Sequence, residues 1–433
     1  MKRMVISIWA ALFVNGVMAY PIDGYERTGI RRLERLRLSV AGEFAGPKPV
    51  EGALKKVDEI TLNLTGARGD SLQFPMRSDS ILQKEIDRLF PNRDESYSIA
   101  LLDISPGKPF RYAARQENRA FSPGSVGKLA VVAGLFTELK RLYSDSIQKR
   151  QALLKTRIVT AGEWIRSDDH VVPVFDPETR VYHSRILHED DQFSLYEWVD
   201  HMLSASANAA ASVVWKEVML MRAFGPGYPP TPEQEQQFFK VTPKAELQKL
   251  SVLVVNDPLR EMGIAEEEWR LGSFFTRRGK EIVPGSLSCG TPLAFLKYLV
   301  RLEQGKIVDT WSSLEIKRLL YMTTKRIRYA SAPRLTSAAV YFKSGSLYKC
   351  KPEPDFVCKK YMGNVENVMN SVAIVEHPNG CVYCVALMSN ILKKNSAVEH
   401  QTLATYIDKI LNKQPEKKIE IPKSAPESED ESE

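Results

Sequence analysis

Residues 121–130 have the sequence Phe121-Ser122-Pro123-Gly124-Ser125-Val126-Gly127-Lys128-Leu129-Ala130. Proline and glycine interrupt the chain here, and an apolar run over residues 129–136 follows. This pattern predicts a loop that leads into a buried helix, with Ser125 and Lys128 in its first turn. A spacing of three places both side chains on one face of the helix, so the amine can reach the hydroxyl.

A serine hydroxyl attacks an amide only when a neighbouring base activates it, and a lysine can be that base if its pKa is lowered. Alone, the pair is a weak signal, because a capping serine followed by a surface lysine has the same spacing. Two other motifs are excluded. A phosphate-binding loop needs glycine where the chain has Ser122, and a nucleophile elbow needs glycine where it has Pro123.

Two further motifs make the signal specific, because Ser206-Ala207-Asn208 and then Lys343-Ser344-Gly345 follow in the chain. The order Ser-x-x-Lys, Ser-x-Asn, Lys-Ser-Gly resembles the penicillin-recognising serine hydrolases, which comprise class A β-lactamases and penicillin-binding D,D-peptidases. The resemblance covers residues 78–411. It implies an α/β (α+β) sandwich, in which a mainly antiparallel sheet is flanked by helices and an all-helical lobe is inserted after the second strand.

The resemblance also implies catalytic roles for five residues. Ser125 would attack a carbonyl and form an acyl-enzyme, with Lys128 as the general base. Ser206 would relay a proton to the leaving nitrogen, and Asn208 would hold Lys128 or the substrate amide. Lys343 would lower the pKa of Lys128 and attract a substrate carboxylate.

Substrate binding is assigned by the same resemblance to Ser344, Gly345 and Ser346. The backbone N–H groups of Ser125 and Ser346 would form an oxyanion hole, and Ser344 would contact the substrate carboxylate. The substrate would be a small β-lactam or a peptidoglycan peptide. No metal or other cofactor is expected.

The base that removes the acyl group is less clear in the sequence. Class A β-lactamases carry a glutamate for this step, but the corresponding position falls on residues 273–275, which contain no carboxylate. Glu268 lies near and is the candidate, against the alternative of an ordinary surface glutamate. Without such a base the acyl-enzyme would react slowly with water, which would favour a D,D-carboxypeptidase or transpeptidase.

A different class of function is a non-catalytic protein that uses the same cleft to bind peptidoglycan or a partner. A metal hydrolase or a Ser-His-Asp enzyme is disfavoured, because no histidine lies in a recognisable motif. His170, His183 and His188 are expected to be scattered on the surface. A formal charge of +7 is mild for 433 residues and does not call for nucleic acid.

The N-terminal residues 1–19 have the pattern of a signal peptide. Lys2 and Arg3 precede an apolar run that is short for a membrane span, and Val17-Met18-Ala19 is a typical cleavage site. The alternative is an uncleaved anchor. We therefore expect a periplasmic or secreted protein that is exported through the membrane without spanning it.

The remaining segments complete the predicted organisation. Residues 20–77 form an N-terminal extension, which has an arginine-rich, solvated helix at 30–38 and a short strand at 61–64. Residues 224–250 and 350–367 are expected insertions, and residues 412–433 a disordered tail. Cys350 and Cys358 could pair, whereas Cys381 and Cys384 would be packed thiols on opposite faces of a strand.

Overall fold

A five-stranded antiparallel sheet forms the centre of the protein, with the strand order β2-β1-β11-β10-β9. The computed structural model describes residues 19–46 and 48–413. The strands of the sheet are β1 Ser98–Asp103, β2 Arg111–Arg115, β9 Ala339–Lys349, β10 Glu366–Glu376 and β11 Val382–Asn390. Three pairs of short strands lie outside it: β3 Ile158–Thr160 with β6 Gln192–Ser194, β4 Val172–Asp176 with β5 Val181–Arg185, and β7 Trp269–Arg270 with β8 Cys289–Gly290.

The sheet separates two hydrophobic cores, because successive residues of a strand point to opposite faces. On β1, Leu101 belongs to one core and Leu102 to the other. The central strands are therefore buried on both faces, and their sequences are apolar almost throughout.

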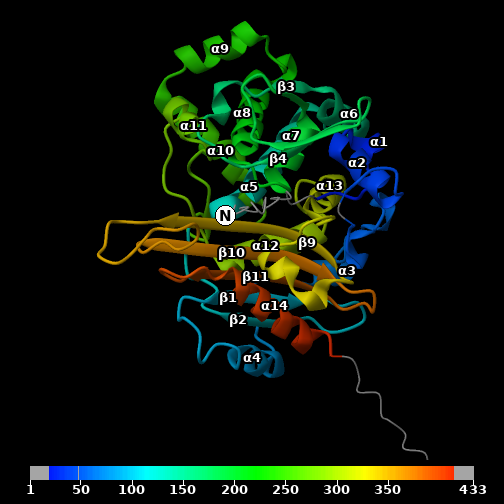
Figure 1. Ribbon diagram of the computed structural model, residues 1–433, viewed down its shortest axis with the longest axis vertical. Coiled ribbons are helices and arrows are strands. Elements are labelled where there is room, and N and C mark those ends of the chain that lie inside the picture. Colours follow the sequence, from blue (N-terminus) through cyan, green and yellow to red (C-terminus); the bar gives the residue numbers. More distant parts are fainter. Residues whose placement is uncertain (1–18, 47, 414–433) are drawn as a thin grey trace, which may run out of the picture.

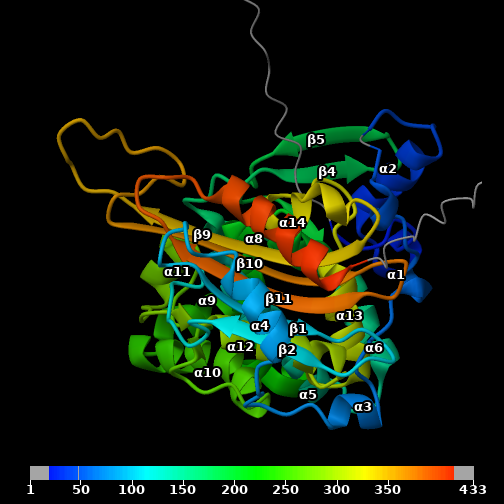
Figure 2. The ribbon, with the colours of Figure 1, turned by 90° about the horizontal axis from the view of Figure 1, so that it is seen from below.

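Helices cover both faces of the sheet, as Figures 1 and 2 show. One face packs against α4 Ser80–Asp87 and α14 Ala397–Leu411, and the other against α12 Pro292–Glu303 and α13 Thr310–Leu320. Thr291 caps α12 through a hydrogen bond to Ala294 N, as the Thr-Pro sequence predicts.

The helical lobe lies above the sheet in Figure 1, between β2 and β9 in the chain. Its helices are α5 Lys128–Leu142, α6 Ile147–Thr156, α7 Leu195–Leu203, α8 Asn208–Phe224, α9 Pro232–Val241, α10 Lys244–Glu261 and α11 Arg277–Ile282. The apolar helix α5 packs against α8 and α10 and is buried on all sides over most of its length. A capping box of Ser194 and Glu197 begins α7. The architecture predicted from the sequence is thus confirmed.

Residues 19–46 and 48–77 pack against this fold and contribute to its core. They contain α1 Tyr25–Thr28, α2 Arg31–Val40 and α3 Ala67–Asp70. The expected strand at 61–64 is wrong, because residues 61–62 have no regular structure and residues 63–64 form a bend. The expectation of a solvated arginine-rich helix is also wrong, since Arg32 pairs with Asp200 in the interior and the Arg35 guanidinium lies 3.5 Å from the Tyr182 ring centroid.

The cysteines behave as the sequence predicted. Cys350 and Cys358 form a disulfide, and Cys381 and Cys384 are buried in different cores. None of the helices in the described part of the chain is long and apolar enough to cross a membrane. The predicted leader lies outside the described residues except for Ala19, and the predicted tail lies outside them from residue 414 onward.

The packing of residues 19–77 can be tested by shortening a buried side chain of α2. Leu36 is fully buried, so Leu36→Ala is expected to lower the free energy of unfolding by about 2–5 kcal/mol. Leu54 lies in the same segment but is 45% exposed, and Leu54→Ala should cost roughly 1 kcal/mol or less. Urea unfolding of both variants measures the difference, and equal costs would show that the segment does not belong to the core.

Candidate active site

Ser125 and Lys128 lie at the junction between a short 3-10 helix, Gly124–Gly127, and α5, which begins at Lys128. Pro123 and Gly124 end the preceding loop, and Gly124 has a φ of +50° that favours glycine. The predicted contact is present, since Lys128 Nζ lies 2.8 Å from Ser125 Oγ.

The Lys128 amine is completely buried and is surrounded by oxygen atoms. Besides Ser125 Oγ, it lies 2.8 Å from the Ser206 carbonyl oxygen and 2.7 Å from Asn208 Oδ1. Burial lowers the pKa of Lys128 to about 7, although the negative charge of Asp168 opposes the shift. A neutral amine can donate its two hydrogens to the two carbonyl oxygens, which only accept, and offer its lone pair to the hydroxyl hydrogen of Ser125.

Ser206 connects the two lysines. It lies between α7 and α8 with a φ of +61°, which is uncommon for serine. In this conformation its backbone carbonyl faces Lys128 and its hydroxyl faces Lys343. The carbonyl oxygen accepts from Lys128, and Ser206 Oγ accepts from Lys343 Nζ at 2.7 Å. The lowering of the pKa of Lys343 has burial as its main cause, followed by the charges of Lys128 and Arg328. The repulsion between the two amines thus acts mainly on Lys343, rather than on Lys128 as predicted.

The Lys343-Ser344-Gly345 motif lies on β9, which is the edge strand of the sheet. The strand approaches the 3-10 helix so closely that a Cβ atom on Gly345 would lie 2.4 Å from the Pro123 carbonyl oxygen and 3.1 Å from Ser125 N. Only glycine permits this approach, which brings the backbone of Ser346 beside the nucleophile.

Arg328 was not identified from the sequence. It begins a 3-10 helix, Arg328–Ser331, with a φ of +51° and donates to the Gly345 carbonyl oxygen and Ser346 Oγ at 2.9 and 3.1 Å. Burial is the main cause that lowers the pKa of Arg328, but an arginine keeps its charge. No motif marks it, because it lies in an ordinary basic segment with Lys325 and Arg326.

Two cavities adjoin the nucleophile, with volumes of about 130 and 360 Å³. Lys343, Ser344, Gly345 and Ser206 line the smaller cavity, and Asn208 lines the larger one. Four residues line both cavities: Ser125, Ser346, Tyr361 and His170. Tyr361 lies in the expected insertion 350–367, which follows β9 and contains the Cys350–Cys358 disulfide.

Glu268 does not line either cavity. One of its oxygens accepts from Ala265 N, and the other pairs with Lys297 on α12. Residues 273–275, where the resemblance places a glutamate, contain no carboxylate, and the ring centroid of Phe275 lies 4.6 Å from Lys128 Nζ. The structure therefore does not place Glu268 where a base would meet the acyl group on Ser125.

His183 and His188 are exposed, as expected, but His170 is half-buried and lines both cavities beside Ser125. Its Nδ1 lies 2.5 Å from Asp168 Oδ1, and Asp168 Oδ2 accepts from Ala209 N at 2.8 Å. Asp168, Asp169 and His170 are the one group of potential metal-binding side chains within the described residues. Asp169 is 96% exposed and the other two bond to each other, so this is a hydrogen-bonded pair at the N-terminus of α8. The adjacent Asp-Asp-His run was the available sequence signal.

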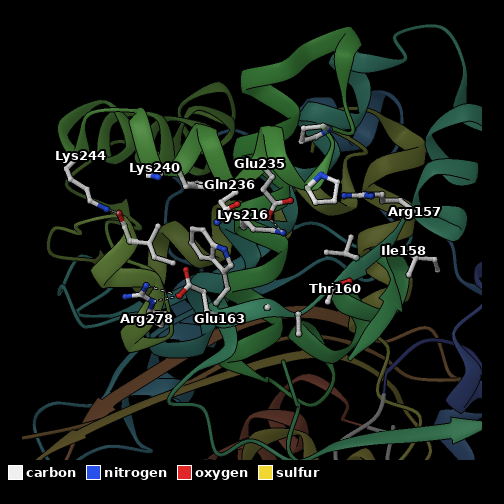
Figure 3. A pocket seen from close by; sticks show the side chains of 18 residues that line it. Arg157, Ile158, Thr160, Glu163, Lys216, Glu235, Gln236, Lys240, Lys244 and Arg278 are labelled. Atoms are coloured by element: carbon white, nitrogen blue, oxygen red, sulfur yellow. Dashed lines mark hydrogen bonds and ion pairs between the residues drawn. The ribbon is translucent and has the colours of Figure 1, made fainter. Parts of the chain in front are cut away.

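A larger cavity of about 580 Å³ lies between η4 Gly162–Ile165 and α9, away from Ser125 (Figure 3). Arg278 is beside Glu163 and Lys216 is beside Glu235, with N–O distances of 2.8 and 2.6 Å. None of the three motifs contributes to its lining. The reactive groups therefore lie at the two smaller cavities.

Solved structures with a similar fold include a class A β-lactamase from Bacteroides cellulosilyticus, which is 15% identical with a TM-score of 0.50 and covers 78% of this chain and 98% of its own. PBP-A is 13% identical with a TM-score of 0.49, and the similarity covers 78% of this chain and 99% of PBP-A. A β-lactamase from Chitinophaga pinensis is 14% identical with a TM-score of 0.48, and the similarity covers 76% of this chain and 98% of the β-lactamase. No family model and no curated protein matches the sequence. The similarity to the Bacteroides cellulosilyticus structure shows that the chain has the fold of class A β-lactamases. At this identity it establishes the fold alone.

Proposed function

We propose that the protein is an exported serine hydrolase that forms an acyl-enzyme on Ser125 with a β-lactam or a related amide. The observation that carries this proposal is the contact between Ser125 Oγ and the buried amine of Lys128, whose pKa is lowered to about 7. A neutral amine at this distance can remove the hydroxyl proton as the oxygen attacks a carbonyl carbon.

The other polar groups support the same reaction. Ser206 Oγ, held by Lys343, can pass a proton to the leaving nitrogen, while Asn208 fixes the amine of Lys128. The close approach of β9 to the 3-10 helix supports an oxyanion hole formed by Ser125 N–H and Ser346 N–H.

The charges near Ser125 favour an anionic substrate. Lys343 and Arg328 contribute to the lining of the smaller cavity, beside Ser344 and Ser346. A carboxylate next to the scissile amide would be attracted to the Arg328 guanidinium, which keeps its charge, and would accept from the Lys343 amine and the serine hydroxyls. Both β-lactams and peptides that end in a carboxylate have this chemistry.

Two alternatives remain distinct from hydrolysis of a β-lactam. A D,D-carboxypeptidase or transpeptidase would use the same groups on a peptidoglycan peptide, and the lack of a carboxylate in residues 273–275 favours it. A non-catalytic binder would not require the Lys128 amine to be buried against Ser125 Oγ.

Export is consistent with the Cys350–Cys358 disulfide, because disulfides persist in oxidising compartments. Expression in a bacterium tests it: the mass of the protein recovered from the periplasm shows whether residues 1–19 have been removed.

Acylation of Ser125 can be tested by incubating the purified protein with benzylpenicillin and measuring its intact mass. We expect the mass to increase by one penicillin, because β-lactam opening leaves the whole molecule on the serine. Ser125→Ala should abolish the adduct, whereas Ser122→Ala, which removes a nearby hydroxyl, should keep it. A protein that binds penicillin without a covalent adduct would favour the binder.

The pH dependence of acylation tests the role of Lys128. Below a pH of about 7 the amine is protonated and cannot accept a proton, so the acylation rate should fall about tenfold per pH unit and level off above this value. Stopped-flow labelling with a fluorescent penicillin measures the profile. Lys128→Arg should lower the rate by about 10²–10⁴-fold, and Lys140→Arg at the other end of α5 should not. A flat profile between pH 5.5 and 8.5 would contradict the assignment.

A further inference from the structure

The pair formed by Asp168 and His170 is built so that one ring nitrogen remains available. Burial tends to raise the pKa of Asp168, but the hydrogen bonds from His170 and Ala209 N outweigh it, and the pKa is lowered. The carboxylate is therefore ionised and takes the hydrogen of His170 Nδ1, which leaves Nε2 as a proton acceptor. No group in the described part of the chain forms a hydrogen bond with His170 Nε2.

The ring also lies where water and an acyl group on Ser125 would meet. His170 lines both cavities that adjoin Ser125, and its side chain is 34% exposed, so water in either cavity can reach it. The pair is rigidly placed, because the second oxygen of Asp168 accepts from Ala209 N in the first turn of α8. The same turn carries Asn208, which binds Lys128.

The proposed hydrolysis otherwise lacks a base for its second step. Lys128 serves the attack of Ser125, residues 273–275 contain no carboxylate, and Glu268 is paired with Lys297. The lining of the two cavities contains one carboxylate, that of Asp169, and at 96% exposure it points into solvent.

We propose that His170, oriented by Asp168, is the general base that activates water to hydrolyse the acyl-enzyme on Ser125. The inference rests on the proposed function. His170 Nε2 takes one proton from water as the water oxygen forms a bond to the acyl carbon and the carbonyl electron pair moves onto oxygen. The tetrahedral intermediate then collapses and breaks the bond between the acyl carbon and Ser125 Oγ. The imidazolium gives its proton to Ser125 Oγ, so the products are a carboxylic acid and the free enzyme.

The test separates the two chemical steps in the full chain. Wild type, His170→Gln and His183→Gln are acylated with benzylpenicillin, the free antibiotic is removed, and the decay of the adduct is followed by intact mass. We expect His170→Gln to be acylated within about twofold of the wild-type rate and to lose the adduct about 10²–10⁴-fold more slowly. His183 is exposed in the same segment, so His183→Gln should behave like wild type in both steps.

A chemical rescue distinguishes a base from a structural residue. Imidazole in the buffer should accelerate decay of the adduct in His170→Gly, because it can replace the missing ring, and should have little effect on wild type. If both steps fall together and imidazole restores neither, His170 only shapes the site and the proposal is overturned. Equal decay of the adduct in wild type and His170→Gln, or a wild-type adduct that does not decay, would also overturn it. If wild type forms no adduct at all, the proposed acyl-enzyme itself is refuted.

Discussion

The contact between the buried Lys128 amine and Ser125 Oγ is the constraint on which the site depends. A buried ammonium is expensive unless it is paired, and here the groups in contact with it are a hydroxyl and two carbonyl oxygens, with no carboxylate among them. The neutral form is therefore favoured, and under the proposed function Ser125 has a base that is ready before substrate arrives. Burial of this amine lowers the stability of the fold, and the extensive apolar core around α5 offsets the loss.

Three separate parts of the chain must meet to maintain that contact. The 3-10 helix before α5 positions Ser125, the left-handed conformation of Ser206 turns a carbonyl toward Lys128, and the edge strand β9 approaches over Gly345. Since the sheet and the helical lobe each contribute, the site exists only in the complete fold. The Arg328 guanidinium, with the amine and hydroxyl donors beside it, fits a substrate that brings its own carboxylate.

The sequence predicted the fold and the central residues well, because these depend on local signals. Apolar periodicity located the strands and helices, and three short motifs identified Ser125, Lys128 and Lys343. No motif marks Arg328, and the Asp-Asp-His run that ends at His170 does not show where it lies, because each residue reaches the site through tertiary packing. The same reason explains why Arg32 was assigned to the surface: its partner Asp200 is remote in the sequence. The causes of the pKa shifts likewise depend on burial, which a motif does not report.

The most direct test of the central claim is the pKa of Lys128, measured by NMR on protein labelled at the lysine ε-carbons, with the signal assigned through Lys128→Arg. The account predicts that this signal titrates at a pH of about 7, well below the other lysines on the surface. Titration near the ordinary lysine value of about 10.4 would contradict it, because Lys128 would then be an ammonium ion at neutral pH and could not activate Ser125.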